Sequence, residues 1–581
     1  MNTTRTGWLL ALVISCIAAA VALLLQNVLR DTWQIRTLPE RVEEWLLLFV
    51  PLDLFERGLQ QLGANAKEVA LAGTVVGMAA LLIALGALTL RAGWTGWGLL
   101  GLGVGMWLLA MAIVMPVTGA GFFATGLLIA PLLVNTGYLV VFLSYACVLI
   151  GGRLVTQLSA GKHPAMMAER RALLAGVVGT LLAGGVARLI GSEGGLVASR
   201  LPLAAAPTPQ PAPTPAPTLL TGTPGPSAPP RTGPAPTSSA PPIAVATPTL
   251  EPLPNPPPPR HLVRDKDGAL TAAGRPKGEL ASPITANDDF YVVTKNAVMD
   301  PIVDAATWRL VIDGEVNRPV QVDYRTLRAL PAVEVTKTLE CISNFTAGCS
   351  LTTFGCDLIS TARWRGARLS DVLDLAGGLK PSAVGVAFLS TDEFSAGLPP
   401  DVVGDPETLV VYEMNGQPLP REHGFPARLL VPGRYGMKNP KWLAGIRAMT
   451  QEYQGWYEQR NWNKDGIIKT MSRIDVPADG ARLTAGDQRI AGIAYAGDRG
   501  LTKVEFSTDD GGTWRPAQIL EPMAGKDTMV RWEATLALPV VASLTITVRA
   551  TDGAGDVQTE EFQLPQPDGA SGRDSITISV A

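Results

Sequence analysis

Five long apolar segments in the first 200 residues constrain the fold of this chain more than any other feature. They cover residues 8–29, 69–90, 94–114, 133–151 and 172–190. Each has the length and apolarity that a helix needs to cross a bilayer core of about 30 Å. The short connections carry the basic residues Arg91, Arg153, Lys162, Arg170 and Arg171. The positive-inside bias therefore predicts a multi-pass, all-α membrane domain with its N-terminus inside the cell and everything after the fifth span outside.

The pair Arg170–Arg171 directly precedes the fifth span. One interpretation is a basic stop before a membrane helix. The other is an internal twin-arginine export signal, because the arginines are followed by a moderately apolar run rich in Gly and Ala. That route exports proteins already folded around a cofactor, so the nature of the next domain bears on the choice.

The composition changes three times after the membrane segments. Residues 201–259 are mainly Pro, Ala, Thr, Ser and Gly, which cannot bury a core and favour a disordered or semi-stiff stalk. The chain then becomes mixed α/β, with a predicted strand at 307–314 and a predicted helix at 369–378. After residue 468, short alternating strands separated by Gly and Asp turns predict an antiparallel sandwich. The predicted boundaries are 1–195 for the membrane anchor, 196–280 for the stalk, 281–467 for the oxidoreductase domain and 468–581 for the C-terminal domain.

Charge and histidine content exclude several functions. A net charge of −3 and a pI near 5.8 argue against a nucleic-acid partner. The chain has only three histidines and no Cys-x-x-Cys, so a haem held by paired histidines, a c-type haem and a zinc ribbon are not expected.

Three of the five cysteines, Cys341, Cys349 and Cys356, lie close together in sequence. Their spacing matches no common zinc or iron–sulfur pattern. A domain outside the cell permits disulfides, so the simplest interpretation is that two of these thiols form a disulfide and the third remains free. The remaining thiol is either inert or a ligand or nucleophile.

Four separated segments resemble the sulfite oxidase family. "TLECISN" (338–344) is similar to the family's molybdenum-ligand segment, and "LISTARWRGARLSDVL" (358–373) resembles its Trp-x-Gly segment before a helix. "EHGFPARLLVPGRYGMKNPKWL" (422–443) resembles the pterin-binding segment. "VRATDGAGDVQ" (548–558) is similar to the end of the family's immunoglobulin-like domain. The resemblance implies a mixed α/β molybdopterin domain followed by an all-β immunoglobulin-like sandwich.

The resemblance also implies a molybdenum-molybdopterin cofactor. Cys341 is then the metal ligand, because a thiolate is a soft anionic donor that complements the two dithiolene sulfurs of the pterin. His423, Arg428 and Lys441 are expected to hold the pterin and its phosphate through charge-assisted hydrogen bonds. Further cofactor-binding candidates are Asn296, Asn344, Gly436 and Lys438.

Three positions depart from the family's pattern. Trp462 stands where the family has its catalytic tyrosine, Lys295 replaces the arginine of an Arg-Asn-His segment, and Phe345 replaces an arginine after the metal-ligand segment. Sulfite is a compact dianion that calls for a dense cationic pocket, so these departures put sulfite itself in doubt as the substrate. The cations that could partly restore this charge are Lys295, Arg434 and Arg460.

The segment 345–356 is longer than the corresponding loop of the family. We expect an inserted hairpin, closed by a disulfide between Cys349 and Cys356. The predicted catalytic residues are Cys341, Trp462 and Lys295.

The predicted function is membrane-anchored, extracytoplasmic oxidoreduction by two-electron oxygen-atom transfer at molybdenum. Because the chain has no haem or cluster motif, a separate electron carrier is implied, either a cytochrome or a quinone-linked protein. The C-terminal domain could mediate a homodimer. The alternatives are a sulfoxide-type reductase of the same fold and a non-catalytic binding or sensory module on a membrane stalk.

Overall fold

The structure is a computed structural model. It describes residues 7–50, 66–127, 129–159, 166–192, 204–205, 252–255, 257–258, 263–264, 270–271, 277–296, 300–348, 356–520, 525 and 527–581. Most of the predicted stalk lies outside these ranges, and so does Cys349.

All five predicted spans are helices, and each is long and apolar enough to cross a membrane. They are α1 (Trp8–Trp33), α4 (Ala66–Arg91), α5 (Gly96–Leu109) with its continuation through a π-turn (Ala110–Val114) into α6 (Met115–Val117), α7 (Pro131–Ser159) and α8 (Met166–Ser192). Helix α7 is the most buried, because α1, α5 and α8 all pack against it. Arg153 of α7 donates to the carboxylate of Glu169 in α8 at 2.9 Å, so the two buried side chains form an ion pair.

A short helix, α2 (Leu38–Leu46), follows the first span and continues into a 3-10 turn at Leu47–Phe49. Thr37 begins it with a capping box, in which the carboxylate of Glu40 accepts from the Thr37 N–H at 2.8 Å. Helix α2 and the residues before it position the charged side chains that meet the central domain.

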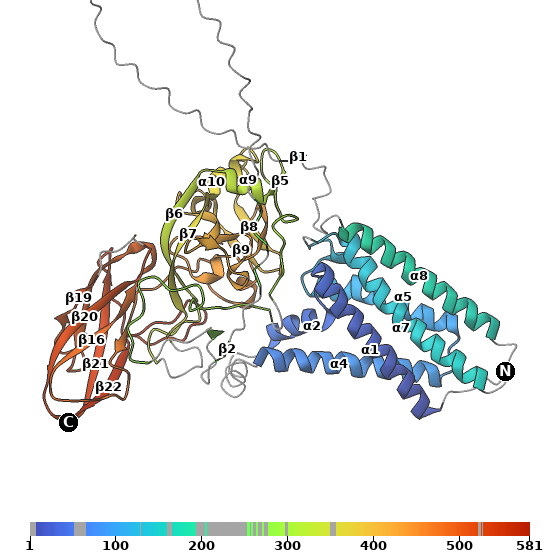
Figure 1. The fold of residues 1–581 in the computed structure, drawn as a ribbon, viewed down its shortest axis with the longest axis horizontal. Helices are drawn as coiled ribbons and strands as arrows, with labels where there is room; N and C mark the ends of the chain where they lie inside the picture. Colours follow the sequence, from blue (N-terminus) through green and yellow to red (C-terminus); the bar gives the residue numbers. More distant parts are fainter. Residues whose placement is uncertain are drawn as a thin grey trace, which may run out of the picture.

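The central domain is built on two sheets (Figure 1). One has the strand order β1-β5-β4-β13-β8-β9, formed by β1 (Ala204–Ala205), β5 (Val320–Asp323), β4 (Arg309–Gly314), β13 (Leu443–Met449), β8 (Gly385–Ser390) and β9 (Ser395–Leu398). The other has the order β11-β10-β7-β6, formed by β11 (Gln417–Pro418), β10 (Leu409–Met414), β7 (Ile359–Arg368) and β6 (Ala332–Glu340), with β12 (Arg428–Leu430) paired to β10. A small separate pair is β2 (Val263–Arg264) with β3 (Leu270–Thr271).

Short helices connect these strands: α9 (Tyr324–Ala329), α10 (Leu369–Asp374) and α11 (Pro400–Val403). The strand and the helix predicted in this domain are confirmed as β4 and α10. Gly377 and Gly378 both have a positive φ after α10, which is why glycine ends this helix. One apolar core spans both sheets and includes the fully buried Trp308 and Trp364.

The C-terminal domain is rich in β-strands, as predicted, and its two sheets enclose a separate apolar core. One sheet has the order β14-β16-β20-β19, formed by β14 (Met471–Val476), β16 (Gly486–Tyr495), β20 (Val530–Leu538) and β19 (Gln518–Ile519). The other has the order β15-β22-β21-β17-β18, formed by β15 (Arg482–Leu483), β22 (Ser575–Val580), β21 (Val541–Asp552), β17 (Leu501–Ser507) and β18 (Arg515–Pro516).

Buried polar contacts join the central and C-terminal domains. The ammonium group of Lys337 lies 2.7 Å from the carboxylate of Asp527, and both side chains are buried. The hydroxyl of Tyr495 donates to the same carboxylate at 2.6 Å. These bonds attach the C-terminal domain to β6, the strand that leads to the predicted metal ligand.

Candidate active site

A cavity of about 80 Å³ lies in the central domain, just beyond the end of β6. Its lining comes from the segment before β4, the residues after β6, the turn between β8 and β9, the stretch from β10 to β13, and Tyr457. We call it the active-site cavity. The predicted residues that line it are Lys295, Cys341, His423, Arg428, Gly436 and Lys441.

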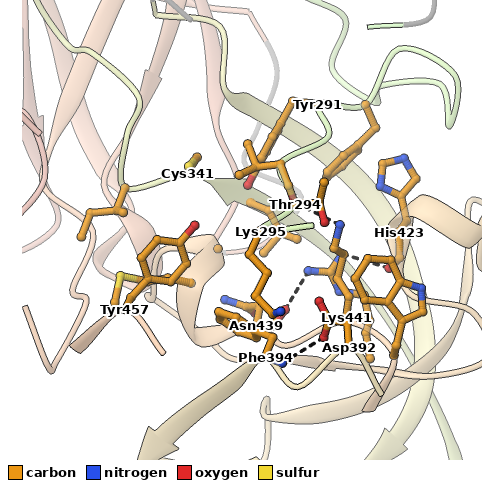
Figure 2. A pocket seen from close by; sticks show the side chains of 18 residues that line it. Tyr291, Thr294, Lys295, Cys341, Asp392, Phe394, His423, Asn439, Lys441 and Tyr457 are labelled. Carbon is orange, nitrogen blue, oxygen red and sulfur yellow. Dashed lines mark hydrogen bonds between the residues drawn. The ribbon is translucent and has the colours of Figure 1, made fainter. Parts of the chain in front are cut away.

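Cys341 follows β6 directly and faces this cavity (Figure 2). Its N–H donates to the carbonyl oxygen of Leu358 at 2.9 Å, and its Sγ accepts from the N–H of Ser343 at 3.4 Å. The side chain is 7% exposed and is a thiol rather than half of a disulfide. The turn therefore holds one sulfur at the wall of the cavity.

Asn344 stabilises the turn that carries Cys341, but it is not among the residues that line the cavity. Its side-chain oxygen accepts from the N–H of Leu358 at 2.9 Å, and its amide donates to the carboxyl group of Glu340 at 2.9 Å. Burial raises the pKa of Glu340 to about 8, so this carboxyl group is largely protonated at neutral pH. Asn344 thus shapes the Cys341 turn.

Arg428 and Lys441 bring two buried cations to the cavity. Arg428 donates to the carbonyl oxygens of His423 and Asn439 at 3.1 and 3.0 Å, and Lys441 donates to those of Val293 and Glu422 at 3.0 and 2.8 Å. Burial lowers the pKa of Lys441 and lowers that of Arg428 to about 10, which leaves the guanidinium charged at neutral pH. Carbonyl oxygens do not neutralise these charges, so the pair favours an anionic group in the cavity.

His423 and Gly436 line other parts of the same cavity. His423 is 2% exposed, and its Nε2 lies 3.3 Å from the carbonyl oxygen of Asn287. Gly424 follows with φ +110°, and a Cβ there would lie 3.0 Å from the Cβ of Lys441. A Cβ on Gly436 would lie 2.9 Å from the hydroxyl of Tyr291, so glycine keeps this wall open.

Three other predicted residues do not line the cavity. Asn296 donates to the carboxylates of Asp300 and Asp392, each at 3.1 Å, and so fixes Asp392, which does line it. Lys438 is buried and paired with Glu458. Trp462 packs edge to face on Tyr457, with ring centroids 5.9 Å apart. The Trp462 side chain, which was predicted to be catalytic, is therefore not among the residues that line the cavity.

The sequence analysis missed Tyr457, Tyr291, Thr294 and Asp392, all of which line the cavity. In Figure 2, Tyr457 and Cys341 lie on the left of the cavity and His423 on the right. Burial, and then the nearby charge of Cys341, raise the pKa of both tyrosines, so both stay protonated and can donate hydrogen bonds. For Tyr457, the only signal in the sequence was the dense run of aromatic residues at 453–462.

Comparisons with known proteins match both domains beyond the stalk. Residues 297–457 match the oxidoreductase molybdopterin binding domain, and residues 465–564 match the Mo-co oxidoreductase dimerisation domain. The sulfite oxidase of Arabidopsis thaliana is 30% identical over 359 residues, which are 53% of this chain and 90% of the plant protein. The chain belongs to the sulfite oxidase family.

Other relatives in the comparison are longer proteins. The mitochondrial sulfite oxidase of Mus musculus is 32% identical over 319 residues, which are 48% of this chain and 57% of the mouse protein. The nitrate reductase [NADH] of Ulva prolifera is 32% identical over 295 residues, which are 42% of this chain and 34% of the algal protein. This chain thus spans little more than half of the mouse protein.

Members of the sulfite oxidase family are molybdenum-dependent oxidoreductases, and family membership confirms the predicted molybdenum-molybdopterin cofactor. The cavity fits that group. The Nε of Arg428 is buried and has no hydrogen-bond partner among the described residues, so an acceptor from a ligand would satisfy it. The Cys341 sulfur supplies a soft donor, and the Arg428–Lys441 pair suits a phosphate.

Lys295 links the active-site cavity of this sulfite oxidase family protein to its helical domain. Its ammonium group lies 3.1 Å from the carboxylate of Glu44 at the end of α2. Arg36 donates to both oxygens of the same carboxylate, at 2.7 and 2.6 Å. Nearby, Arg41 donates to both oxygens of Glu393, at 2.9 and 2.6 Å. The helical domain is therefore docked directly beside the active site.

Glu44 is held in its charged form by these partners. Burial opposes the charge, but Arg36 and Lys295 outweigh it and hold the pKa of Glu44 well below its usual range. A lowered carboxyl pKa stabilises the fold above the ordinary value of about 4, and this stabilisation is lost as the pH falls below it.

We expect Glu44→Gln to weaken this docking, because it leaves Lys295 and Arg36 buried without their counter-charge. The cost should be on the order of 3 kcal/mol, which lowers the thermal unfolding midpoint by several degrees. Differential scanning calorimetry of the full chain in detergent measures this. The matched control is Glu452→Gln, whose exposed pair with Lys464 should contribute almost nothing. Equal midpoints for the two variants would contradict the prediction.

Proposed function

We propose that this chain is a membrane-anchored oxidoreductase that catalyses two-electron oxygen-atom transfer outside the cytoplasm. The observation that best supports the proposal is the active-site cavity itself. There the buried sulfur of Cys341 faces a wall that carries Arg428 and Lys441. A soft anionic donor and buried cations are the two things that a molybdopterin site requires from the protein.

Within this proposal each residue has a role. When bound, the molybdenum cofactor supplies the two-electron redox chemistry. Cys341 holds the metal, and Arg428, Lys441 and His423 hold the pterin and its phosphate. Tyr291 and Tyr457 donate hydrogen bonds to substrate oxygen atoms, since burial keeps them protonated. Lys295 and Asp392 form the charged wall on the side of the helical domain, and Asn296 positions Asp392 by a hydrogen bond.

The proposed organisation follows the predicted boundaries. Residues 1–195 anchor the chain by five spans, 196–280 form the stalk, 281–467 bind the cofactor, and 468–581 form an immunoglobulin-like domain that mediates a homodimer. The match of residues 465–564 to a dimerisation domain supports the last role. The pair Arg170–Arg171, at the start of α8, serves as the export signal.

The disulfide between Cys349 and Cys356 remains part of the proposal. Cys356 is buried, whereas Cys349 lies outside the described residues. The electron carrier also remains a proposal, as a cytochrome or a quinone-linked protein.

A second candidate, reduction of sulfoxide-like groups, is favoured by one observation. Lys295 is ion-paired with Glu44, which lowers its effective charge, and neither Arg434 nor Arg460 is among the residues that line the active-site cavity. Such a pocket suits a neutral substrate better than a dianion. Assays of sulfite oxidation and dimethyl sulfoxide reduction with an artificial electron carrier distinguish the two candidates.

The cofactor content tests the proposed function directly. The full chain, purified from cells that synthesise the pterin, should hold about one molybdenum and one pterin, because the domain binds one cofactor. Inductively coupled plasma mass spectrometry measures the metal, and fluorescence of the oxidised pterin measures the organic part. Protein from a pterin-deficient strain is the control. Metal-free native protein would overturn the proposal.

A further inference from the structure

A second cavity, of about 260 Å³, lies where the helical domain meets the central domain. It is lined by α2 and its flanks, by the turn between the third and fourth spans, and by residues of the central domain around β8, β9 and 453–460. We call it the junction cavity. Its volume is far larger than the roughly 10–15 Å³ that a single water needs.

Four hydrogen-bonding groups of its lining have no partner among the described residues. They are Arg41 Nε, Ser390 Oγ, Trp456 Nε1 and Arg460 Nε, and each atom is buried. Arg41 and Ser390 are each only 2% exposed. Buried polar groups are nearly always satisfied in native proteins, and all four of these can donate. Together they call for a ligand that carries acceptor oxygens.

The charges of the lining favour a neutral ligand. Arg36, Arg41 and Arg460 face the carboxylates of Glu44 and Glu393, which leaves a single positive charge among the lining residues. Arg36 and Arg41 are each bonded through two nitrogens to a carboxylate. A phosphate or a dianion would meet these carboxylates as well, whereas a carbonyl oxygen needs only the donors.

The junction cavity lies at the edge of the apolar helices. Val117, at the end of the third span, lines it and is half exposed. Trp45 also lines it and packs edge to face on the exposed Phe49, with ring centroids 4.9 Å apart. A lipid-soluble molecule could therefore reach it from the bilayer.

The two cavities share a wall. Phe394 lines both of them, and its ring lies 6.4 Å from that of Trp456 in the junction cavity. The rings of Trp456 and Tyr457 are 4.9 Å apart, and Tyr457 lines the active-site cavity. A carrier bound in the junction cavity would thus be separated from the active site by a thin aromatic layer.

We propose that the junction cavity binds a quinone, which exchanges electrons directly with the active site. The inference rests on the proposed function. In it, a small lipid-soluble molecule takes the place of a separate carrier protein. The overall reaction balances: oxidation of a substrate with one water gives the oxygenated product, two protons and two electrons. Quinone takes up two electrons and two protons and leaves as quinol.

The test is photolabelling of the full chain in phosphatidylcholine nanodiscs with an azido-quinone, in competition with decyl-ubiquinone. Labelled peptides, identified by mass spectrometry, should contain the segments 36–45, 389–395 or 453–460. Trp456→Phe keeps the ring but removes the indole donor, and Ser390→Ala removes the hydroxyl. Each should lower labelling about fivefold, the usual effect of losing one hydrogen bond.

Trp514→Phe is the matched control. Arg460 lies 3.5 Å from the ring centroid of Trp456, and Trp514 has a similar contact, with Arg549 4.0 Å from its ring centroid, but it lies in the C-terminal domain. Labelling that is unchanged in both test variants, confined to lipid-facing helices, or competed by sulfate rather than by decyl-ubiquinone would overturn the proposal.

Labelling does not require the molybdenum cofactor, so it can be measured on protein from the pterin-deficient strain. A metal-free native protein that is labelled in the junction cavity would overturn the proposed function and the electron exchange, and leave only the quinone site. A molybdenum-loaded protein without labelling would overturn the quinone site alone.

Discussion

Turnover with an artificial electron carrier is expected to fall at least about a hundredfold when Cys341 is replaced by serine, because a hydroxyl is a poor donor to molybdenum compared with a thiolate. Cys341 is the only described cysteine that lines the active-site cavity. The protein should still fold, since serine differs from cysteine by one atom and the surrounding turn is held by main-chain bonds. Pterin content should fall by much less than turnover.

The matched control for this variant is Cys16→Ser, because Cys16 is an exposed thiol on α1, far from the cavity in sequence. Its turnover should equal that of the wild type. A Cys341→Ser protein that keeps the wild-type rate would show that this sulfur does not bind the metal.

The second large effect is expected for Arg428→Met, which should reduce pterin content to below about a tenth. A charge-assisted hydrogen bond contributes about 1.5–3 kcal/mol, which corresponds to a loss of affinity of about 10- to 100-fold. The methionine fills part of the space over Trp364, where the guanidinium now lies 5.3 Å from the ring centroid. Fluorescence of the released, oxidised pterin measures the change.

Two further variants keep this prediction decisive if Arg428→Met is unstable. Arg428→Lys retains the charge and should recover part of the pterin. Arg489→Met removes an exposed arginine paired with Glu533 in the C-terminal domain and should leave pterin content unchanged. Full pterin content in Arg428→Met, with the native circular dichroism spectrum, would contradict the proposed role of Arg428.

Much of the site could be predicted from sequence because it lies in contiguous motifs. Cys341, His423, Arg428 and Lys441 sit in segments whose residue types and spacing match those of the family, and the structure places all four around one cavity. Their positions depend on local turns, such as the glycine at 424 that lets Lys441 and Arg428 approach each other.

The rest of the site depends on contacts between distant segments. Tyr291 lies near the beginning of the central domain's sequence and Tyr457 near its end. No short motif indicates that both line the cavity. Asn344 and Lys438 are polar residues within matching motifs, but their bonds are to Glu340 and Glu458 rather than toward the cavity. At these positions the motif predicted that a turn forms, but not the direction in which each side chain points.

The contact between the helical and central domains could not be predicted at all. Lys295 and Glu44 are 251 positions apart, and Arg41 and Glu393 are 352 apart. A sequence-based argument treats the spans as an anchor, because apolar periodicity says nothing about what the polar turn between two spans touches. The structure instead makes α2 part of the contact between the helical domain and the central domain, beside the active-site cavity.

X-ray absorption at the molybdenum edge tests the central claim most directly, because it counts the sulfur atoms bound to the metal. The full chain should give three, two from the pterin dithiolene and one from Cys341. Cys341→Ser should give two, with the same amount of metal bound. Three sulfurs in both proteins, or two in both, would contradict the assignment of Cys341 as the ligand.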